Sequence, residues 1–419
     1  MALRLSKGLA MLDPSHTYPF MTDAGATAIL AALPEGSTRF VGGCIRNALW
    51  NLPVADIDMA TKISPRDVQI ALKAASIKTV PTGIAHGTLT AVVGGKPYEI
   101  TTLRRDVETD GRRAVIAYTE DWAEDAQRRD FTVNALYADA DGQIYDPTGE
   151  GLTDIEARRF RFVGDADARV REDFLRILRL FRFVAWYGQD AKITKEALTA
   201  CRENRRGLKT LSAERVWSET KKLLSARDPV RSVRIMLQHE LLDTLLPEAS
   251  NVDGLVALVA LEARENIKPD PLLRLMAMMG RDALSAALLA KRLKLSNKEA
   301  ARLKGWASDG ETLSHDMPER ARMQAIYRSG KQVILDRARL RAAGAEAAIE
   351  SAHWMVLADL ALGWTPPTFP LRGADLITAG VPKGPQLGKA LAALEALWVR
   401  SGFSTEKPQL LAALKLLGY

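Results

Sequence analysis

The chain has 419 residues, and 58 Lys and Arg against 51 Asp and Glu give it a formal net charge of +7. This length predicts two or more domains with sizeable cores, and no apolar run reaches the roughly 20 residues of a membrane span. Its two cysteines, Cys44 and Cys201, are too few for a disulfide framework or a cysteine metal site. Because the first 20 residues lack the basic-then-apolar pattern of a secretory signal, a cytoplasmic location is expected.

The first ~150 residues alternate between strand-like and helix-like patterns. The predicted strands are 38–41 and 56–59, and the predicted helices are 45–51 and 65–76, the second with Ser64 as its N-cap. Apolar runs at 88–93 and 98–102 flank Gly94-Gly95, which predicts a β-hairpin. The charged segment 104–119 is typical of a flexible loop.

From Asp167 onward, apolar residues recur at helical spacing and few strands are predicted. The predicted helices are 174–184, 214–224, 230–242, 252–263, 272–288 and 387–398, with a break near Pro366-Pro367. The sequence therefore predicts an α+β multidomain protein, with a mixed head that holds a small sheet and an all-helical remainder.

Arginine pairs are concentrated between Arg104 and Arg182. Guanidinium groups bind phosphate oxygens in pairs, so a phosphate-rich partner would explain this concentration. A solvated basic surface is the alternative.

A glycine pair and two aspartates carry the strongest chemical signal. Gly42 and Gly43 stand at a predicted strand-to-helix turn, where the backbone can approach a phosphate closely. Asp56 and Asp58 follow on the next predicted strand, and residues two apart on a strand share one face. Two such carboxylates can hold Mg²⁺ beside substrate phosphates. The pattern predicts phosphoryl or nucleotidyl transfer with both aspartates as metal-binding catalytic residues; a solvated strand face is the alternative.

A third catalytic carboxylate is expected on a neighbouring strand. Glu99 is the best-placed candidate, because Asp106 and Asp125 stand in less strand-like surroundings. The alternative for Glu99 is an exposed residue of an edge strand.

Asp173 and Arg176 form a second constellation, three residues apart on a predicted helix and therefore neighbours. On their Watson–Crick edges, cytosine and adenine both present an amino donor beside a ring-nitrogen acceptor, whereas guanine and uracil present the reverse. An Asp that accepts and an Arg that donates would therefore take CTP and ATP and reject GTP and UTP, since mismatched polar groups cost ~1–3 kcal/mol each. The alternative is a simple intrahelical ion pair.

Further segments accompany these motifs in order, and together they span residues 38–225. They are 41–46, 56–58, 83–88, 99–104, 125–135, 145–147, 172–179 and 212–215. In this order the chain resembles the class II tRNA nucleotidyltransferases (CCA-adding enzymes), whose superfamily includes bacterial poly(A) polymerases. Each segment alone is a weak signal, and the ordered set is a specific one.

The resemblance implies a polymerase-β-like nucleotidyltransferase head over residues 1–160. A helical neck with a nucleotide-template helix over 161–250 and a tRNA-binding body and tail over 251–419 would follow. Asp173 and Arg176 match the family's protein template for C and A, and residues 104–119 match the element used when specificity switches from CTP to ATP. The nucleotide-binding residues that it implies are Gly42, Gly43, Arg46, Arg129, Asp173, Arg176, Arg179 and Arg182.

The expected reaction is template-independent addition or repair of the 3′-terminal CCA of tRNA from CTP and ATP, with Mg²⁺ as cofactor. The expected partners are the tRNA 3′ end and these nucleotides, with no membrane and no stable protein partner. The nearest alternative is a poly(A) polymerase; a partial enzyme that adds only CC or only A, and an inactive RNA-binding relative, are others. The family usually has Asp where this chain has Asn47, and activity is expected to persist.

Overall fold

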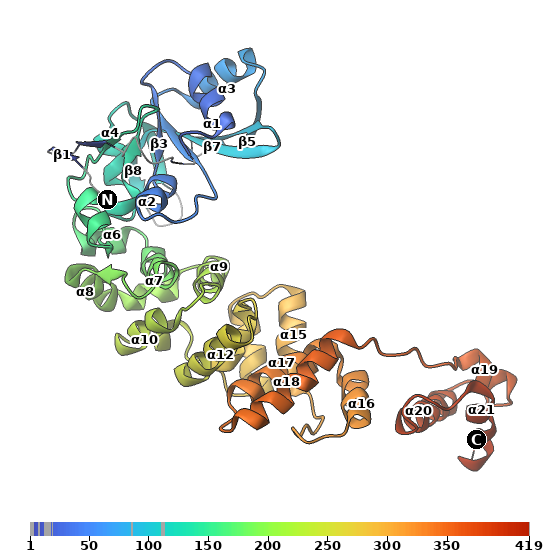
Figure 1. Ribbon diagram of the computed structural model, residues 1–419. Helices are drawn as coiled ribbons and strands as arrows, with labels where there is room; N and C mark the ends of the chain where they lie inside the picture. The colour runs from blue at the N-terminus through green and yellow to red at the C-terminus, as the bar shows by residue number, and fades with distance from the viewer. Residues whose placement is uncertain are drawn as a thin grey trace. The chain divides into compact units, whose positions relative to one another are not determined.

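The computed structural model describes residues 4–6, 9–11, 18, 20–84, 87–109 and 114–418. The chain divides into two compact units, Met1–Pro247 and Glu248–Tyr419 (Figure 1). No helix in the described part of the chain is both long and apolar enough to cross a bilayer. Both cysteines are free and buried. Residues 85 and 86 of the segment 83–88 lie outside the described residues.

A mixed sheet forms the centre of the first unit. Its parallel pair is β4 with β7, whereas β3 with β4, β6 with β7 and β5 with β6 are antiparallel. The parallel register sets Asp58 directly beside Glu99. In spatial order the described strands are β1 (Arg4–Ser6), β2 (Leu9–Met11), β11 (Gln143–Tyr145), β10 (Tyr137–Ala138), β3 (Thr38–Val41), β4 (Asp58–Thr61), β7 (Lys96–Thr102), β6 (Thr88–Val93) and β5 (Lys78–Gly83).

The β6–β7 connection confirms the predicted hairpin. Val93 pairs with Lys96, and the two turn residues Gly94 and Gly95 have φ of +58° and +80°. Such a two-residue turn needs positive φ at both positions, which glycine adopts without steric cost.

The helices of the head lie between these strands in the chain. They are α1 (Ala24–Ala32), α2 (Gly43–Leu49), α3 (Pro65–Ala74), α4 (Trp122–Gln127) and α5 (Gly151–Glu156), with a 3₁₀ turn at Thr132–Asn134. Ser64 caps α3 as predicted, because its side chain accepts a hydrogen bond from the Asp67 amide. The predicted loop at 104–119 is wrong for its described residues: β8 (Arg104–Thr109) and β9 (Ala114–Tyr118) pair there as an antiparallel ribbon.

Helices follow the head within the first unit. They are α6 (Ala166–Glu172), α7 (Leu175–Tyr187), α8 (Lys195–Glu203), α9 (Ala213–Leu224), α10 (Val230–Gln238) and α11 (Leu241–Leu245), with a 3₁₀ helix at Arg205–Thr210 and a two-stranded sheet of β12 (Arg159–Phe160) and β13 (Lys192–Ile193). The predicted helix 230–242 is therefore two helices.

Aromatic rings hold α7 against the head. The ring of Phe183 lies 5.3 Å from that of Phe131 and 5.6 Å from that of Phe160. One turn later, Tyr187 lies edge-on to Trp50, with 4.8 Å between ring centroids. Such pairs add about 0.5–1.5 kcal/mol each beyond the area that they bury. These contacts place one face of α7 against the end of α2, Phe131 and the short strand β12.

The second unit is helical throughout its described residues. Its helices are α12 (Val252–Arg264), α13 (Pro271–Met278), α14 (Ala283–Arg292), α15 (Asn297–Ser308), α16 (Glu319–Ser329), α17 (Lys331–Ala343), α18 (Ala348–Gly363), α19 (Gly373–Thr378), α20 (Pro385–Arg400) and α21 (Lys407–Leu416). The predicted helix 272–288 is two helices, because Gly280 lies in a break between α13 and α14.

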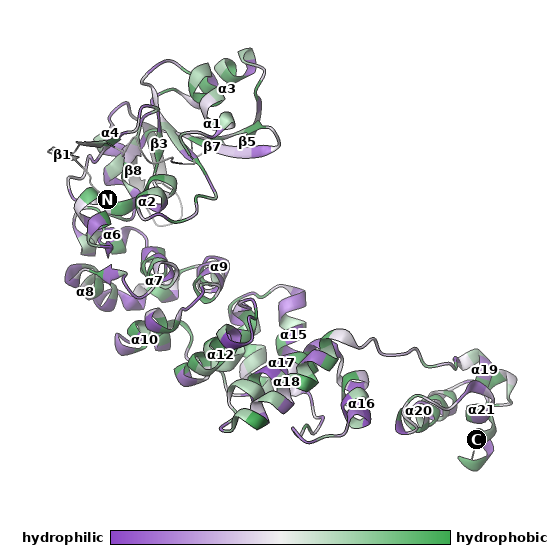
Figure 2. Cartoon of the chain, viewed as in Figure 1, coloured by the Kyte–Doolittle hydropathy of each residue, from purple (hydrophilic) through white to green (hydrophobic). Residues whose placement is uncertain are grey.

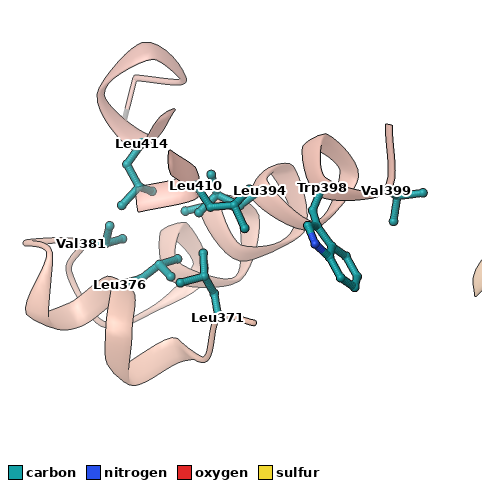
Figure 3. Close-up of a cluster of buried hydrophobic side chains, with 9 residues drawn as sticks. Leu371, Leu376, Val381, Leu394, Trp398, Val399, Leu410 and Leu414 are labelled. Atoms are coloured by element: carbon teal, nitrogen blue, oxygen red, sulfur yellow. The ribbon is translucent and has the colours of Figure 1, made fainter. Parts of the chain in front are cut away.

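The predicted break at Pro366-Pro367 lies between α18 and α19. Beyond it, α19, α20 and α21 bury a cluster of their own, drawn in Figure 3, which includes Leu376, Leu394, Trp398 and Leu410. Purple and green segments alternate along the helices in Figure 2, as in amphipathic helices that bury one face.

Gly254 provides a test of the helix packing in the second unit. A Cβ at this position of α12 would lie 2.1 Å from the backbone oxygen of Ala277, so Gly254→Ala should destabilise the protein by about 1–3 kcal/mol. Gly388 in α20 is exposed with no atom within 4 Å of a Cβ, so Gly388→Ala should stabilise it by ~0.5–1 kcal/mol. Urea unfolding of both full-length variants measures the difference, and equal midpoints would contradict this packing.

Candidate active site

A cleft of about 810 Å³ in the first unit gathers most of the predicted site residues. Its volume is in the range of small-molecule sites. The predicted residues that line it are Gly42, Gly43, Arg46, Asp56, Asp58, Glu99, Arg129, Arg179 and Arg182. Among all its described lining residues, seven are Arg or Lys and four are Asp or Glu, so the walls carry an excess of positive charge.

The glycine pair forms the predicted turn between β3 and α2. Gly42 has φ of +73°, a backbone conformation that favours glycine, and its amide donates to the Leu136 carbonyl at 3.1 Å. A Cβ on Gly42 would lie 3.4 Å from the backbone oxygen of Asn134 and 3.7 Å from the Arg129 guanidinium. The turn thus lies close against the segment that carries Arg129.

The three carboxylates lie on or next to β4 and β7, two neighbouring strands inside the sheet and not at its edge. Asp58 is the first residue of β4 and pairs in register with Glu99 of β7. Asp56 precedes the strand, so the prediction that both aspartates lie on one strand is wrong in its boundary. Ile57, between them, is buried, whereas Asp56 is exposed and Asp58 is half-buried. The two aspartates therefore still face away from the core, and both line the cleft.

Burial and nearby negative charges change the pKa of the Asp58 carboxyl. Partial burial, followed by the charges of Glu99 and Asp56, raises the pKa of Asp58 to about 6. Within the described residues, no three His, Cys, Asp or Glu side chains converge closely enough to hold a metal ion alone. A pair of carboxylates that leaves positions for phosphate oxygens and water is nevertheless the usual arrangement for Mg²⁺. The donors at Asp56 and Asp58 fit that ion.

A buried carboxylate that the sequence did not single out as a partner supports Arg129. Asp125, fully buried on α4, accepts from the Arg129 guanidinium at 2.9 Å and from Tyr137 at 2.7 Å. Burial alone would raise the pKa of Asp125, but the charges of Arg129 and Arg128 lower it to about 2. Arg129 is therefore held in place at the cleft by an ionised partner.

Arg46 is buried among neutral groups. Its guanidinium donates to Asn47 at 3.0 Å, and also to Asn134 and Tyr187. The guanidinium carbon lies 5.0 Å from the ring centre of Phe183 and 4.7 Å from that of Tyr187. Burial lowers the pKa of Arg46, although it stays charged at neutral pH. These hydrogen-bond partners leave the positive charge of Arg46 without a carboxylate.

The side-chain amide of Asn47 both accepts and donates hydrogen bonds. Its Oδ1 accepts from Tyr187 as well as from Arg46, and its Nδ2 donates to the carbonyl of Pro53 at 2.9 Å. An aspartate could accept in the same way but could not donate to Pro53. The asparagine thus joins the end of α2 to the segment that leads to Asp56.

Two further arginines extend from α7. Arg179 forms an ion pair with Asp130 at 2.5 Å, and Arg182 forms one with the buried Glu219 of α9 at 2.8 Å. The charge of Asp130 raises the pKa of Arg179, and burial lowers that of Arg182. Both arginines line the same cleft as Asp56, Asp58 and Glu99.

Asp173 and Arg176 are not among the residues that line the cleft. They also do not share a helix as predicted, because α6 ends at Glu172 and α7 begins at Leu175. Asp173 forms an ion pair with Arg215 at 2.7 Å, and Arg176 forms one with Glu172 at 2.6 Å. Arg176 also donates to the backbone carbonyl of Arg169 at 2.6 Å.

Residues of α7 beyond the predicted arginines also line the cleft. They are Phe183, Trp186 and Tyr187, joined by Lys222 of α9. Positions 179, 182, 183 and 186 follow the helical spacing of one face, so this spacing could have found them. Lys222 could not be found in this way, because it belongs to another helix.

Comparison with known proteins identifies the family. Residues 38–161 match the family described as "Poly A polymerase head domain", and residues 190–252 match "Probable RNA and SrmB- binding site of polymerase A". The chain is similar to the solved Bacillus stearothermophilus CCA-adding enzyme in complex with CTP, with 27% identity, a TM-score of 0.75 and coverage of 97% of this chain and 98% of that one. This likeness confirms the predicted α+β fold class.

Two curated relatives match over most of their length. The zebrafish (Danio rerio) protein named "CCA tRNA nucleotidyltransferase 1, mitochondrial" is 31% identical over 402 residues, which cover 90% of this chain and 86% of that one. The CCA-adding enzyme of Latilactobacillus sakei is 30% identical over 380 residues, which cover 90% and 93%. The chain belongs to the family of CCA-adding tRNA nucleotidyltransferases.

Proposed function

We propose that this chain adds or repairs the 3′-terminal CCA of tRNA, with CTP and ATP as its nucleotides. The observation that carries this proposal is the pairing of Asp58 with Glu99 at a cleft whose opposite residues are arginines, in a chain of this family. Poly(A) polymerase is not favoured, because the relatives that match over most of the chain are named for CCA addition.

The family depends on a divalent metal, and we propose Mg²⁺ held by Asp56 and Asp58. When bound, this ion lowers the pKa of the attacking 3′-hydroxyl and neutralises charge on the phosphates. Glu99, directly beside Asp58, is proposed as the third catalytic carboxylate. The 3′ oxygen of the RNA forms a new bond to the α-phosphorus as the bond to the β-phosphate oxygen breaks, and pyrophosphate leaves.

Arginines are proposed to bind the triphosphate. In the described part of the chain, the hydrogen-bond partners of Arg46 are neutral, and the charge of Asp130 does not outweigh the effect of burial on its pKa, so a phosphate can supply a further anion. Arg129, Arg179 and Arg182 keep their carboxyl partners Asp125, Asp130 and Glu219 and so hold their positions while phosphate oxygens approach. Gly42 and Gly43 leave the backbone of the turn accessible from the cleft.

Asp173 and Arg176 are proposed as the protein template that selects C and A. Arg176 belongs to α7, which carries Arg179 and Arg182 into the cleft, and Asp173 lies two residues before this helix. Both side chains are polar, charged and held by other charged groups, Arg215 and Glu172. If Asp173 leaves Arg215 and Arg176 leaves Glu172 to bind the edge of a base, both side chains turn into the cleft.

The domain division is also proposed on family grounds. Residues 1–160 would be the catalytic head and 161–250 the neck, followed by a body and tail over 251–419 that bind tRNA. The matches at 38–161 and 190–252 support the first two parts. The proposed location is the cytoplasm; the zebrafish relative is named mitochondrial, and both compartments hold tRNA.

A primer-extension assay tests the proposed function. Purified protein and Mg²⁺ are incubated with tRNA transcripts that end at the discriminator base, at C or at CC, with CTP, ATP or both. Growth to CCA followed by arrest is expected, and chelation of the metal should abolish it. A long A ladder on any RNA would instead identify a poly(A) polymerase.

Asp58→Asn tests whether the pKa of Asp58 is raised in the folded protein. Burial and the nearby carboxylates raise the pKa of Asp58 from its ordinary value of 3.8 to about 6 in the folded protein, so its stabilising contribution is complete below pH 3.8 and lost as pH rises through 6. Asn at this position should therefore raise the metal-free unfolding free energy at pH 7.5 by up to ~3 kcal/mol, with little gain at pH 4, while it abolishes nucleotide addition. Asp56→Asn at the exposed position is the control and should give a smaller gain. A metal-free Asp58→Asn protein no more stable than wild type at pH 7.5 would contradict the pKa assignment.

Single substitutions test the proposed template. Asp173→Ala and Arg176→Ala should reduce the preference for CTP and ATP over GTP and UTP by about 10-fold or more, because each removes one discriminating hydrogen bond. The control is Arg171→Ala, which changes an exposed arginine of α6 paired with Asp167 and should leave selectivity unchanged. Full exclusion of GTP and UTP by both template variants would refute base selection by this pair.

A further inference from the structure

Trp186 is an exposed aromatic ring at a charged cleft. All eight tryptophans of the chain lie in described residues, and Trp186 alone is exposed, at 56% of its surface. It stands one turn beyond Arg182 on α7 and lines the cleft that holds the carboxylates. A single exposed side chain needs no ligand to explain it, but this ring lies in a cleft of ligand-binding size, where it is available to contact a bound molecule.

The ring of Trp186 is fixed in orientation. Its indole Nε1 donates to the backbone carbonyl of Lys222 at 2.7 Å, which ties the ring to α9. The neighbouring aromatic residues Phe183 and Tyr187 are committed to the packing of α7 against the head. Among the described residues, no other ring lies against Trp186. It is therefore held in place with a face open to solvent.

We propose that Trp186 is the platform on which the 3′-terminal base of the RNA substrate stacks before each addition. This inference rests on the proposed function. An aromatic face accepts any base, because stacking uses the π surface and reads no hydrogen-bonding edge. That property fits a 3′ end whose last base changes at every step, from the discriminator base to C and then to C again.

The incoming nucleotide has different requirements. It must be discriminated by its base edge, which calls for polar partners such as Asp173 and Arg176, and its triphosphate calls for arginines. The RNA end needs tolerant binding and a nearby cation for its phosphodiester. Lys222 lines the same cleft, and its side chain is 55% exposed although it lies 3.7 Å from Glu219, so its ammonium group is available to that phosphodiester. Trp186 is thus assigned to the RNA and not to the nucleotide.

Steady-state kinetics with two variants test this assignment. Trp186→Ala should raise the KM for tRNA ending at the discriminator base, at C and at CC by about 10- to 100-fold, the range of one lost base stack. The KM for CTP and for ATP should stay within twofold, and Trp186→Phe should restore most of the RNA affinity. Ile70→Ala is the control, since Ile70 is 58% exposed on α3 outside the cleft lining, and it should have no effect.

Fluorescence gives a readout that does not depend on catalysis. A short RNA ending in CC should quench the tryptophan emission of wild type without nucleotide or metal, and the quenching should be absent in Trp186→Phe, which keeps the other seven tryptophans. Equal quenching in both proteins, or an unchanged KM for RNA in Trp186→Ala, would overturn the inference while CCA addition by wild type stands. Failure of wild type to extend tRNA would overturn the proposed function itself.

Discussion

The packing of α7 against the head is the contact on which the whole cleft depends. One wall of the cleft belongs to the sheet and α2, and the other belongs to α7. They meet where the guanidinium of Arg46 lies against the rings of Phe183 and Tyr187, while Tyr187 donates to Asn47 at 2.8 Å. A buried charge costs several kcal/mol unless it is well solvated by protein groups. The neutral cage around Arg46 therefore has to stay assembled, and its assembly fixes the spacing of the carboxylates from the arginines of α7.

Charges in the cleft are organised in layers. Behind the arginines stand buried carboxylates, Asp125 for Arg129 and Glu219 for Arg182, which hold the guanidiniums in position. On the sheet side, Asp58 and Glu99 are adjacent, and the charges of Arg129 and Arg46 compensate only in part, because burial and the neighbouring carboxylates still raise the pKa of Asp58. The two sides of the cleft therefore favour ligands of opposite charge: the carboxylates favour a cation, and Arg46 favours an anion. A metal-bound triphosphate satisfies both.

Local chemistry in the sequence was enough to predict part of this arrangement. The hairpin at Gly94-Gly95 and the turn at Gly42-Gly43 depend on short-range patterns, and the structure has both. The nearness of Glu99 to Asp58 is different, because it follows from the parallel register of β4 and β7 and was expected only because Glu99 stands on a predicted strand. Gly280 and Asp282, the N-cap of α14, signal the split of the predicted helix 272–288, but helical periodicity outweighed both signals.

Contacts between distant segments could not be predicted in this way. Asp173 finds its partner in Arg215, 42 residues away, and Trp186 is tied to a carbonyl of α9. Such pairs follow from the packing of α7 on α9, which leaves no periodic signature in either segment. The ribbon at 104–119 was missed for a related reason: its strands pair with each other through backbone groups, whereas its charged side chains indicate a loop.

The contacts of Arg176 have a consequence for how a base can be read. Its guanidinium already donates to Glu172 and to the carbonyls of Arg169 and Arg128. A base that is to use this arginine must compete with intramolecular acceptors that are always present. Cytosine or adenine can replace one of them with a ring nitrogen, and the exchange is nearly balanced. Guanine or uracil brings a donor to the same place, so the arginine stays where it is. If Arg176 reads the base as proposed, selectivity arises from a resting state that a wrong base cannot displace, in addition to any repulsion in the bound state.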